Sequence, residues 1–298
     1  MTQEEMIKNA EKMRLAWKEN DAKRDEGLTE PSDVEKLTDI CYDTKSDACG
    51  RAHLLDIYYP KGEKRDRPTI VNVHGGGWFY CYKELYRFYC MWLAREGFHV
   101  VNFNYRLAPE YKYPSAIEDV CKVMNFLKEK GKEYHISTKE LFMVGDSAGA
   151  QLTSQYGVIA SNVSYREKLP FETSDVKPKG IALNCGIYEM KDLADDEIRK
   201  WYQPEPFPET LRQSFLNILD YVDETYPPTY LMLSVNDPLK VHSKAMKDKL
   251  EEKEIPMCFR EFGAGHPESG HVFHVDMKNP ESETCNLEEC AFFKRLIK

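Results

Sequence analysis

The chain has 298 residues and a net charge of −9, with 42% hydrophobic, 12% aromatic and 31% charged residues. This composition suffices for a sizeable core, and the acidic balance argues against a nucleic-acid-binding protein, which needs clustered Lys and Arg against phosphates. No run of about 18 apolar residues occurs, so no membrane span is expected.

The first ten residues are polar and lack the apolar core of a secretion signal. The nine cysteines contain no Cys-x-x-Cys pair, and several fall in apolar segments. This pattern favours free thiols in a reducing compartment over a disulfide framework or a metal site. The sequence therefore predicts a cytoplasmic protein.

The chain begins with charged, helix-favouring residues from Thr2 to Glu26, which predict a helical extension lying on the domain. A hairpin is expected next, formed by Leu37–Tyr42 and Arg51–Tyr59. From Arg67 onward, strands and helices alternate. The expected strands are Thr69–Val73, His99–Asn104, Leu141–Val144, Gly180–Asn184, Thr229–Val235 and Met257–Glu261. The expected helices are Lys83–Glu96, Ser115–Lys130, Ser147–Ala160, Leu239–Lys253 and Leu287–Ile297.

This alternation predicts an α/β fold in one domain, residues 1–298, whose mostly parallel sheet is covered on both faces by helices. Between Gly186 and Pro228, roughly forty residues interrupt the alternation, with helical pieces expected at Leu193–Tyr202 and Glu209–Val222. Such an insertion is typical of a lid. We therefore expect cap elements at 1–36 and 186–228, the second of them before the penultimate strand.

The most informative motif is Gly145-Asp-Ser-Ala-Gly149, directly after an apolar strand. A serine hydroxyl becomes a nucleophile when it is exposed and a base removes its proton. A tight strand-to-helix turn provides the exposure, and it needs small residues on both sides of the serine. Ser147 is therefore the candidate nucleophile.

A second motif, His74-Gly-Gly-Gly-Trp78, follows the strand Thr69–Val73. Consecutive glycines leave backbone N–H groups uncovered, as an oxyanion hole requires. We expect Gly75 and Gly76, with Ala148 after the nucleophile, to form that hole. A phosphate-binding loop is the alternative, but the spacing of such loops is absent.

The acid and the base are sought downstream of Ser147. Asp237 follows the strand Thr229–Val235, at the sheet edge where α/β catalytic residues gather, and it can also cap the next helix. Asp220 and Asp223 lie in the expected cap and are poorer candidates.

Three histidines, His266, His271 and His274, share the loop after the last strand. His271 is the expected base, and His274 remains the alternative. A metal at His271 and His274 would lack further ligands at the usual spacing. His74 precedes the serine and suits a structural role in the glycine loop.

Together these residues resemble the hormone-sensitive-lipase-like branch of α/β-hydrolase esterases, from about Asp56 to the end of the chain. The matching motifs are His74–Trp78, Tyr105–Glu110 with Tyr113–Asp119, Gly145–Gly149, and Asp237–Leu239 before His271. The resemblance implies Ser147 as nucleophile, His271 as base and Asp237 as its orienting acid. It also implies a structural Tyr105–Glu110 stretch in which Arg106 pairs with an internal carboxylate. One departure is at the base, where the family usually has His-Gly-Phe, whereas here Val272 follows His271 and a second histidine follows at His274.

The expected function is a serine carboxylesterase that hydrolyses short-chain, acetyl-type esters through an acyl-enzyme, with no cofactor or metal. The cap formed by residues 1–36 and 186–228, with Trp201, Tyr202 and Phe207, is expected to select the alcohol. Amide or peptide cleavage on the same triad is one alternative, and a non-catalytic small-molecule receptor is another. The expected partner is a small ester, without nucleic acid or membrane. A homodimer through an edge strand or the last helices is left open.

Overall fold

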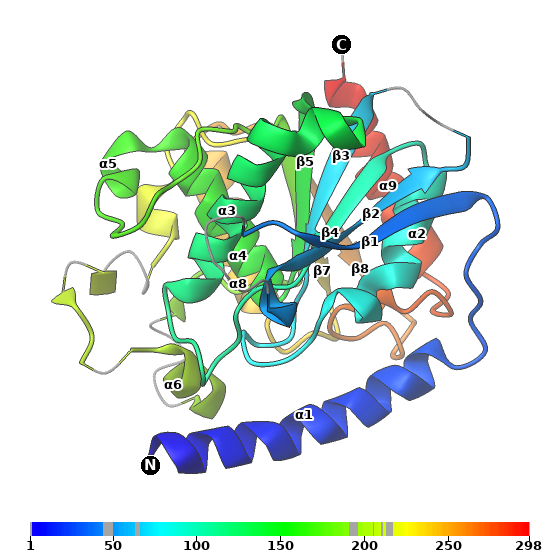
Figure 1. Ribbon diagram of the computed structural model, residues 1–298. Helices are drawn as coiled ribbons and strands as arrows, with labels where there is room; N and C mark the ends of the chain where they lie inside the picture. The colour runs from blue at the N-terminus through cyan, green and yellow to red at the C-terminus, as the bar shows by residue number, and fades with distance from the viewer. Residues whose placement is uncertain are drawn as a thin grey trace.

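Eight strands form one sheet in the computed structural model (Figure 1), in the order β1-β2-β4-β3-β5-β6-β7-β8. The structure describes residues 2–43, 50–62, 66–190, 196–204, 206–209, 211–212 and 217–297. The strands are β1 (Val34–Cys41), β2 (Leu54–Pro60), β3 (Arg67–Val73), β4 (His99–Phe103), β5 (Ile136–Asp146), β6 (Gly180–Asn184), β7 (Thr229–Ser234) and β8 (Met257–Phe262).

The pairing of these strands confirms a mostly parallel sheet. β4, β3, β5, β6, β7 and β8 pair in parallel, whereas β1 pairs with β2, and β2 with β4, in antiparallel fashion. Every residue of β4, β6 and β7 is buried. Strands of a parallel sheet are covered on both faces, which is why they read as continuous apolar runs.

Helices cover both faces of the sheet (Figure 1). In that view α3, α4 and α8 lie on one side and α2 and α9 on the other. The described helices are α1 (Gln3–Asp25), α2 (Arg87–Arg95), α3 (Ser115–Lys130), α4 (Ala148–Ser161), α5 (Val163–Arg166), α6 (Glu197–Tyr202), α8 (Lys240–Glu252) and α9 (Ser282–Leu296).

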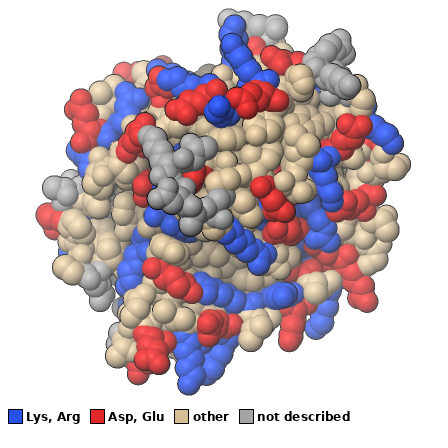
Figure 2. Space-filling model, in the orientation of Figure 1, with Lys and Arg blue, Asp and Glu red and all other residues tan. Residues whose placement is uncertain are grey.

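Helix α1 lies along the edge of the molecule, as expected for the N-terminal extension (Figure 1). It buries only Ala10 fully, and acidic and basic side chains are interspersed over the face of the molecule that contains it (Figure 2). Hydrogen bonds to main-chain carbonyls hold it in place. Arg14 donates to the carbonyls of Phe79 and Ala108, at 2.8 and 2.7 Å. No helix in the described part of the chain is long and apolar enough to cross a membrane.

Some element boundaries differ from those expected. The expected helix Lys83–Glu96 begins with a 3₁₀ turn, and α2 starts only at Arg87, because the buried Lys83 ammonium turns inward to pair with Asp56 at 2.7 Å. Strand β5 and helix α9 each begin five residues earlier than expected.

The cap also differs in part from its expected form. Within the described residues of Glu209–Val222, Glu209, Leu211 and Arg212 are helical as expected, whereas the stretch that follows holds a bridge from Asn217 and a short 3₁₀ turn at Leu219–Tyr221. Residues 193–195, 210 and 213–216 of the expected helical pieces lie outside the described residues. At the other end, residues 34–36 belong to β1 rather than to a cap.

Seven cysteines are free thiols, as expected: Cys81, Cys90, Cys121, Cys185, Cys258, Cys285 and Cys290. Cys41 corrects the expectation, since it is disulfide-bonded. Cys49 lies outside the described residues.

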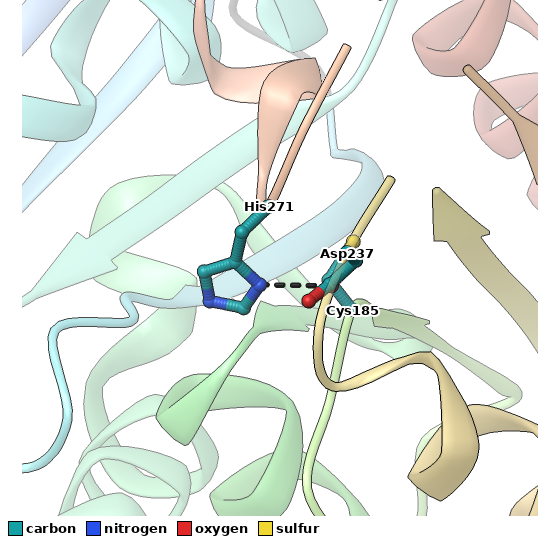
Figure 3. A group of neighbouring side chains, drawn as sticks. All are labelled: Cys185, Asp237 and His271. Atoms are coloured by element: carbon teal, nitrogen blue, oxygen red, sulfur yellow. Dashed lines mark hydrogen bonds and ion pairs between the residues drawn. The ribbon is translucent and has the colours of Figure 1, made fainter. Parts of the chain in front are cut away.

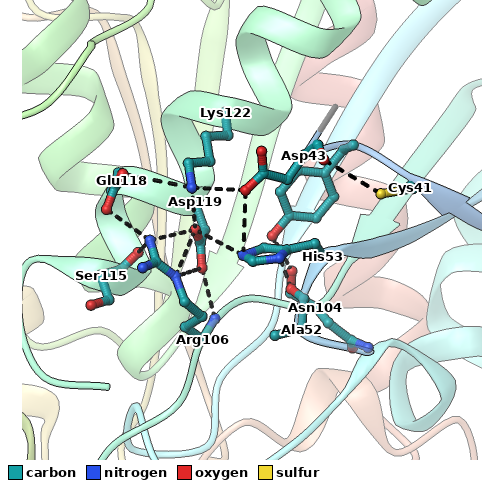
Figure 4. Close-up of polar contacts among 11 residues, drawn as sticks. Cys41, Asp43, Ala52, His53, Asn104, Arg106, Ser115, Glu118, Asp119 and Lys122 are labelled. Carbon is teal, nitrogen blue, oxygen red and sulfur yellow. Dashed lines mark hydrogen bonds and ion pairs between the residues drawn. The ribbon is translucent and has the colours of Figure 1, made fainter. Parts of the chain in front are cut away.

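A cluster of charged side chains under the loop 105–114 supports the glycine loop (Figure 4). Arg106 donates to both carboxylate oxygens of the fully buried Asp119, at 2.7–3.0 Å, which confirms the expected internal partner. The loop in turn reaches the glycine loop, because Tyr105 Oη donates to the His74 carbonyl at 2.9 Å. The main-chain N–H of Ala108 donates to the Trp78 carbonyl at 2.8 Å.

We predict that Asp119→Ala lowers the free energy of unfolding by about 3–5 kcal/mol, because it leaves Arg106 without its buried counter-charge. Urea unfolding followed by circular dichroism measures the change. Asp175→Ala is the matched control, since Asp175 forms an exposed pair with Lys128 and should change stability by less than about 1 kcal/mol. Equal effects of the two substitutions would contradict a supporting role for the cluster.

A second buried carboxylate, Glu289 of α9, connects this helix to the sheet and to α2. Its oxygens accept hydrogen bonds from Asn184 of β6 at 2.7 Å and from Tyr89 Oη of α2 at 2.8 Å. Burial raises the pKa of Glu289 to about 7, although both bonds act to lower it.

This raised pKa predicts a pH-dependent stability. Between pH 4.5 and 7 the folded protein holds a proton on Glu289 that the unfolded chain has lost, so stability falls as the pH rises through this window. The difference in unfolding free energy between wild type and Glu289→Gln should change by up to about 3 kcal/mol across the window and then level off. Taking this difference cancels the titration of groups that both proteins share. Glu288→Gln, which alters an exposed neighbour paired with Arg260, should show no such slope.

Candidate active site

Ser147 lies in the tight turn between β5 and α4, in a backbone conformation that L-residues rarely adopt, with φ +52° and ψ −119°. The turn requires its two glycines. A Cβ on Gly145 would collide with the carbonyl of Gly149, and one on Gly149 would collide with the carbonyl of Val73. The Ser147 N–H donates to the Asn184 carbonyl of β6 at 2.9 Å, which fixes the turn to the sheet.

The structure brings Ser147, His271 and Asp237 together in one hydrogen-bonded chain. His271 Nε2 lies 2.9 Å from Ser147 Oγ, and His271 Nδ1 lies 2.8 Å from Asp237 Oδ2. The other oxygen of Asp237 accepts the Leu239 N–H at 2.8 Å, so this carboxylate also caps the start of the next helical turn. These contacts have the geometry of a nucleophile, a base and an orienting acid.

The Asp237 carboxylate is buried beneath His271. Burial acts to raise its pKa, but the hydrogen bond and the charge of His271, with the Leu239 N–H, lower the pKa below its ordinary value. Asp237 is therefore ionised at neutral pH. An ionised acceptor at Nδ1 keeps the imidazole proton there, and it leaves Nε2 free to accept the proton of Ser147.

The position of His274 contradicts the alternative hypothesis that this residue is the base. Its ring is fully buried and packs edge-on against Tyr89, with the ring centres 5.4 Å apart. Burial lowers its pKa to about 3. His266 lies elsewhere again, half-exposed and 3.2 Å from Glu268. The expected structural role of His74 fits its position, since it is buried, stacks on Tyr105 and bonds the Gly75 carbonyl through Nδ1.

The glycine loop lies beside Ser147, but the expectation for Gly75 has to be corrected. The Gly75 N–H already donates to Tyr86 Oη at 3.0 Å, and its Cα faces Asp146 rather than the cavity. Gly76 and Gly77, both at positive φ, line the cavity with Ser147. Among the described residues, no acceptor is found for the N–H groups of Gly76, Gly77 and Ala148. The candidate donor set is therefore Gly76, Gly77 and Ala148.

Tyr86 and Asp146 hold the glycine loop against the serine turn. Tyr86 Oη accepts the Gly75 N–H and donates to Asp146 Oδ2 at 2.7 Å. Asp146 immediately precedes Ser147, so the Tyr86 hydroxyl connects the serine turn to the glycine loop. Burial raises the pKa of Asp146 to about 6, although the Tyr86 bond opposes this shift.

A cavity of about 420 Å³ opens above Ser147 and His271. Its walls combine residues of α1 with apolar side chains of several loops. The lining residues are Trp17, Asn20, Asp21, Arg24, Gly76, Gly77, Trp78, Tyr80, Cys81, Tyr86, Asp146, Ser147, Ile187, Asp196, Ile198, Leu239, His271 and Val272. Parts of both expected cap segments thus border the site.

The aromatic residues expected to select the alcohol are placed differently. Trp201 and Tyr202 are fully buried, with Trp201 packed on Phe79 and Tyr202 stacked on Trp78 at 5.1 Å. Trp201 and Tyr202 therefore pack behind the residues that form the cavity wall. Ile187 and Ile198 face the cavity instead. The roles of Tyr86 and Asp146 in holding the glycine loop were missed from the sequence, because the hydrogen bond between them joins residues 60 positions apart.

Comparison with known proteins supports an esterase. The BD-FAE family model matches residues 55–250. The chain is similar to esterase B of Lactobacillus rhamnosis, solved with a tributyrin phosphonate inhibitor, at 25% identity and a TM-score of 0.90, covering 99% of this chain and 96% of that one. It is also similar to versiconal hemiacetal acetate esterase of Dothistroma septosporum, at 26% identity over 76% of this chain and 73% of the relative. Esterase LipW of Mycobacterium marinum, at 18% identity and a TM-score of 0.74 over 99% of this chain and 91% of its own, shares the fold.

We predict that Tyr86→Phe lowers kcat for ester hydrolysis about tenfold and leaves KM nearly unchanged. The lost hydroxyl frees the glycine loop, whose N–H groups act mainly in the transition state. Steady-state kinetics on a p-nitrophenyl ester provide the measurement. Tyr89→Phe is the matched control, because Tyr89 is equally buried but bonds Glu289. A loss confined to KM, or an equal loss in both variants, would contradict the assignment.

Proposed function

Because the chain belongs to the BD-FAE family of α/β-hydrolases and is a carboxylic ester hydrolase, we propose that it cleaves short-chain, acetyl-type esters with a Ser147–His271–Asp237 triad. The observation that carries the proposal is the continuous hydrogen-bonded chain from Asp237 through His271 to Ser147, at the floor of a cavity. No metal or cofactor enters this chemistry.

In the proposed acylation, Ser147 Oγ attacks the ester carbonyl while His271 Nε2 takes its proton. The carbonyl oxygen becomes negative and is held by the N–H groups of Gly76, Gly77 and Ala148. His271 then protonates the leaving alcohol, and Asp237 stabilises the transient imidazolium. Water attacks the acyl-enzyme by the same sequence and releases the acid.

The size and lining of the cavity support a short acyl group. A volume of about 420 Å³ must hold both the acyl and the alcohol part of the substrate. Ile187, Ile198, Leu239 and Val272 supply apolar walls, and Asn20 and Asp21 of α1 supply polar ones. Two relatives point the same way, since one is an acetate esterase and the other was inhibited by a tributyrin phosphonate.

A cytoplasmic location and a homodimer stay proposals. The seven free thiols support a reducing compartment, whereas the disulfide at Cys41 argues for an oxidising one. Strands β1 and β8 form the two edges of the sheet and are where a second copy could pair.

The test is a series of p-nitrophenyl esters from acetate to decanoate, with the anilide of the best acyl group run beside them. We expect kcat/KM to peak at acetate to butyrate and the anilide to be a poor substrate. Ser147→Ala should lower kcat by about 10⁴-fold or more. Ser161→Ala, at the far end of α4, is the control and should stay near wild type. A maximum at long chains would refute the acyl assignment, and a faster anilide would favour an amidase.

A further inference from the structure

Three side chains that can bind a metal lie close together, and two of them belong to the proposed triad (Figure 3). Cys185 follows β6, Asp237 follows β7, and His271 lies in the loop after β8. One ligand atom from each, Sγ, a carboxylate oxygen and a ring nitrogen, lies within 4.8 Å of the other two. Among the described residues this is the one group of three or more such side chains in contact.

The thiol of Cys185 is not required by the proposed hydrolysis. It is 1% exposed, and burial raises the pKa of the thiol well above its ordinary value, with the neighbouring Asp237 carboxylate adding to the shift. Its backbone has φ +51°, a conformation that L-residues rarely adopt. The other buried thiols of the described chain belong to no such group of ligands.

We propose that Cys185, Asp237 and His271 form an inhibitory site for a thiophilic divalent cation such as Zn²⁺. The effect on activity rests on the proposed triad, whereas the binding itself does not. Zn²⁺ takes thiolate, imidazole and carboxylate ligands at about 2.0–2.3 Å in a tetrahedron. Such bond lengths place ligand atoms roughly 3.3–3.7 Å apart, so the side chains need only small shifts from their present separations.

Metal binding and catalysis require opposite tautomers of His271. In the proposed resting enzyme the proton is on Nδ1, which donates to Asp237, and Nε2 accepts from Ser147. A cation next to Asp237 is bound by the Nδ1 lone pair, so the ring proton moves to Nε2. The ring then has no site for the serine proton. Cys185 loses its thiol proton to water, and the thiolate and carboxylate together balance the two charges of the cation.

We expect the cation to enter from the cavity, because His271 is the one ligand of the three that lines it. His271 is 32% exposed, whereas Asp237 is buried, and His271 and Val272 both line the cavity above them. Mg²⁺ should not substitute, because it prefers octahedral oxygen ligands. Mg²⁺ therefore serves as a control for the effects of ionic strength and of a divalent charge.

The binding test uses Co²⁺ as the probe and Ser147→Ala as the protein, so that it does not depend on activity. We expect a thiolate-to-cobalt charge-transfer band and the visible bands of a tetrahedral ion, which Zn²⁺ displaces and Mg²⁺ does not. Adding Cys185→Ala should abolish the charge-transfer band, and adding Cys81→Ala should keep it. Cys81 is the matched control, since it is also a buried free thiol but belongs to no such group of ligands in the described part of the chain.

The inhibition test compares Zn²⁺ titrations of ester hydrolysis by wild type, Cys185→Ala and Cys81→Ala. Loss of one ligand should raise the inhibitory Zn²⁺ concentration by about tenfold to a hundredfold in Cys185→Ala only. No cobalt–thiolate band, or a band that persists without Cys185, would overturn the proposal. Equal Zn²⁺ sensitivity of Cys185→Ala and wild type would also overturn it. If the cobalt–thiolate band appears but the wild type hydrolyses no ester, the metal site is supported and the proposed function is refuted.

Discussion

The close approach of β5, α4 and the glycine loop is the constraint on which the rest of the site depends. Ser147 can occupy its positive-φ turn only because Gly145 and Gly149 let three backbone segments meet where a Cβ would collide. A non-glycine residue in this conformation costs on the order of 1–3 kcal/mol, which the surrounding sheet contacts must outweigh. In this turn the Ser147 hydroxyl projects away from its own backbone and lies within hydrogen-bonding distance of His271.

The loops around this turn are held mainly by side chains that bond main-chain groups. Tyr105 bonds the His74 carbonyl, Tyr86 bonds the Gly75 N–H, and Arg14 of α1 bonds the carbonyl of Phe79. Glycine-rich backbone has little side-chain packing of its own, so these bonds supply the rigidity that oxyanion donors need. The polar helix α1 therefore belongs to the site, although it buries little apolar surface.

Asp237 shows how one carboxylate serves local structure and chemistry together. One oxygen accepts the Leu239 N–H and starts the turn before α8, while the other orients His271. This double use fixes the carboxylate in position. The same fixed position places it beside Cys185, so the contact that orients His271 also brings together the three side chains of the proposed cation site.

The sequence by itself determined the alternation of strands and helices, the serine turn and the order of Ser147, Asp237 and His271, because periodicity and local turn chemistry are properties of neighbouring residues. The choice of His271 over His274 needed the tertiary structure, since burial against Tyr89 is decided by a helix far away in the chain. The replacement of Gly75 by Gly77 in the candidate donor set had the same origin. Three consecutive glycines look alike in a sequence, and only the position of Tyr86 decides which N–H is already bonded. The inward Trp201 and the contact of Cys185 with Asp237 likewise join residues distant along the chain, which no local pattern can register.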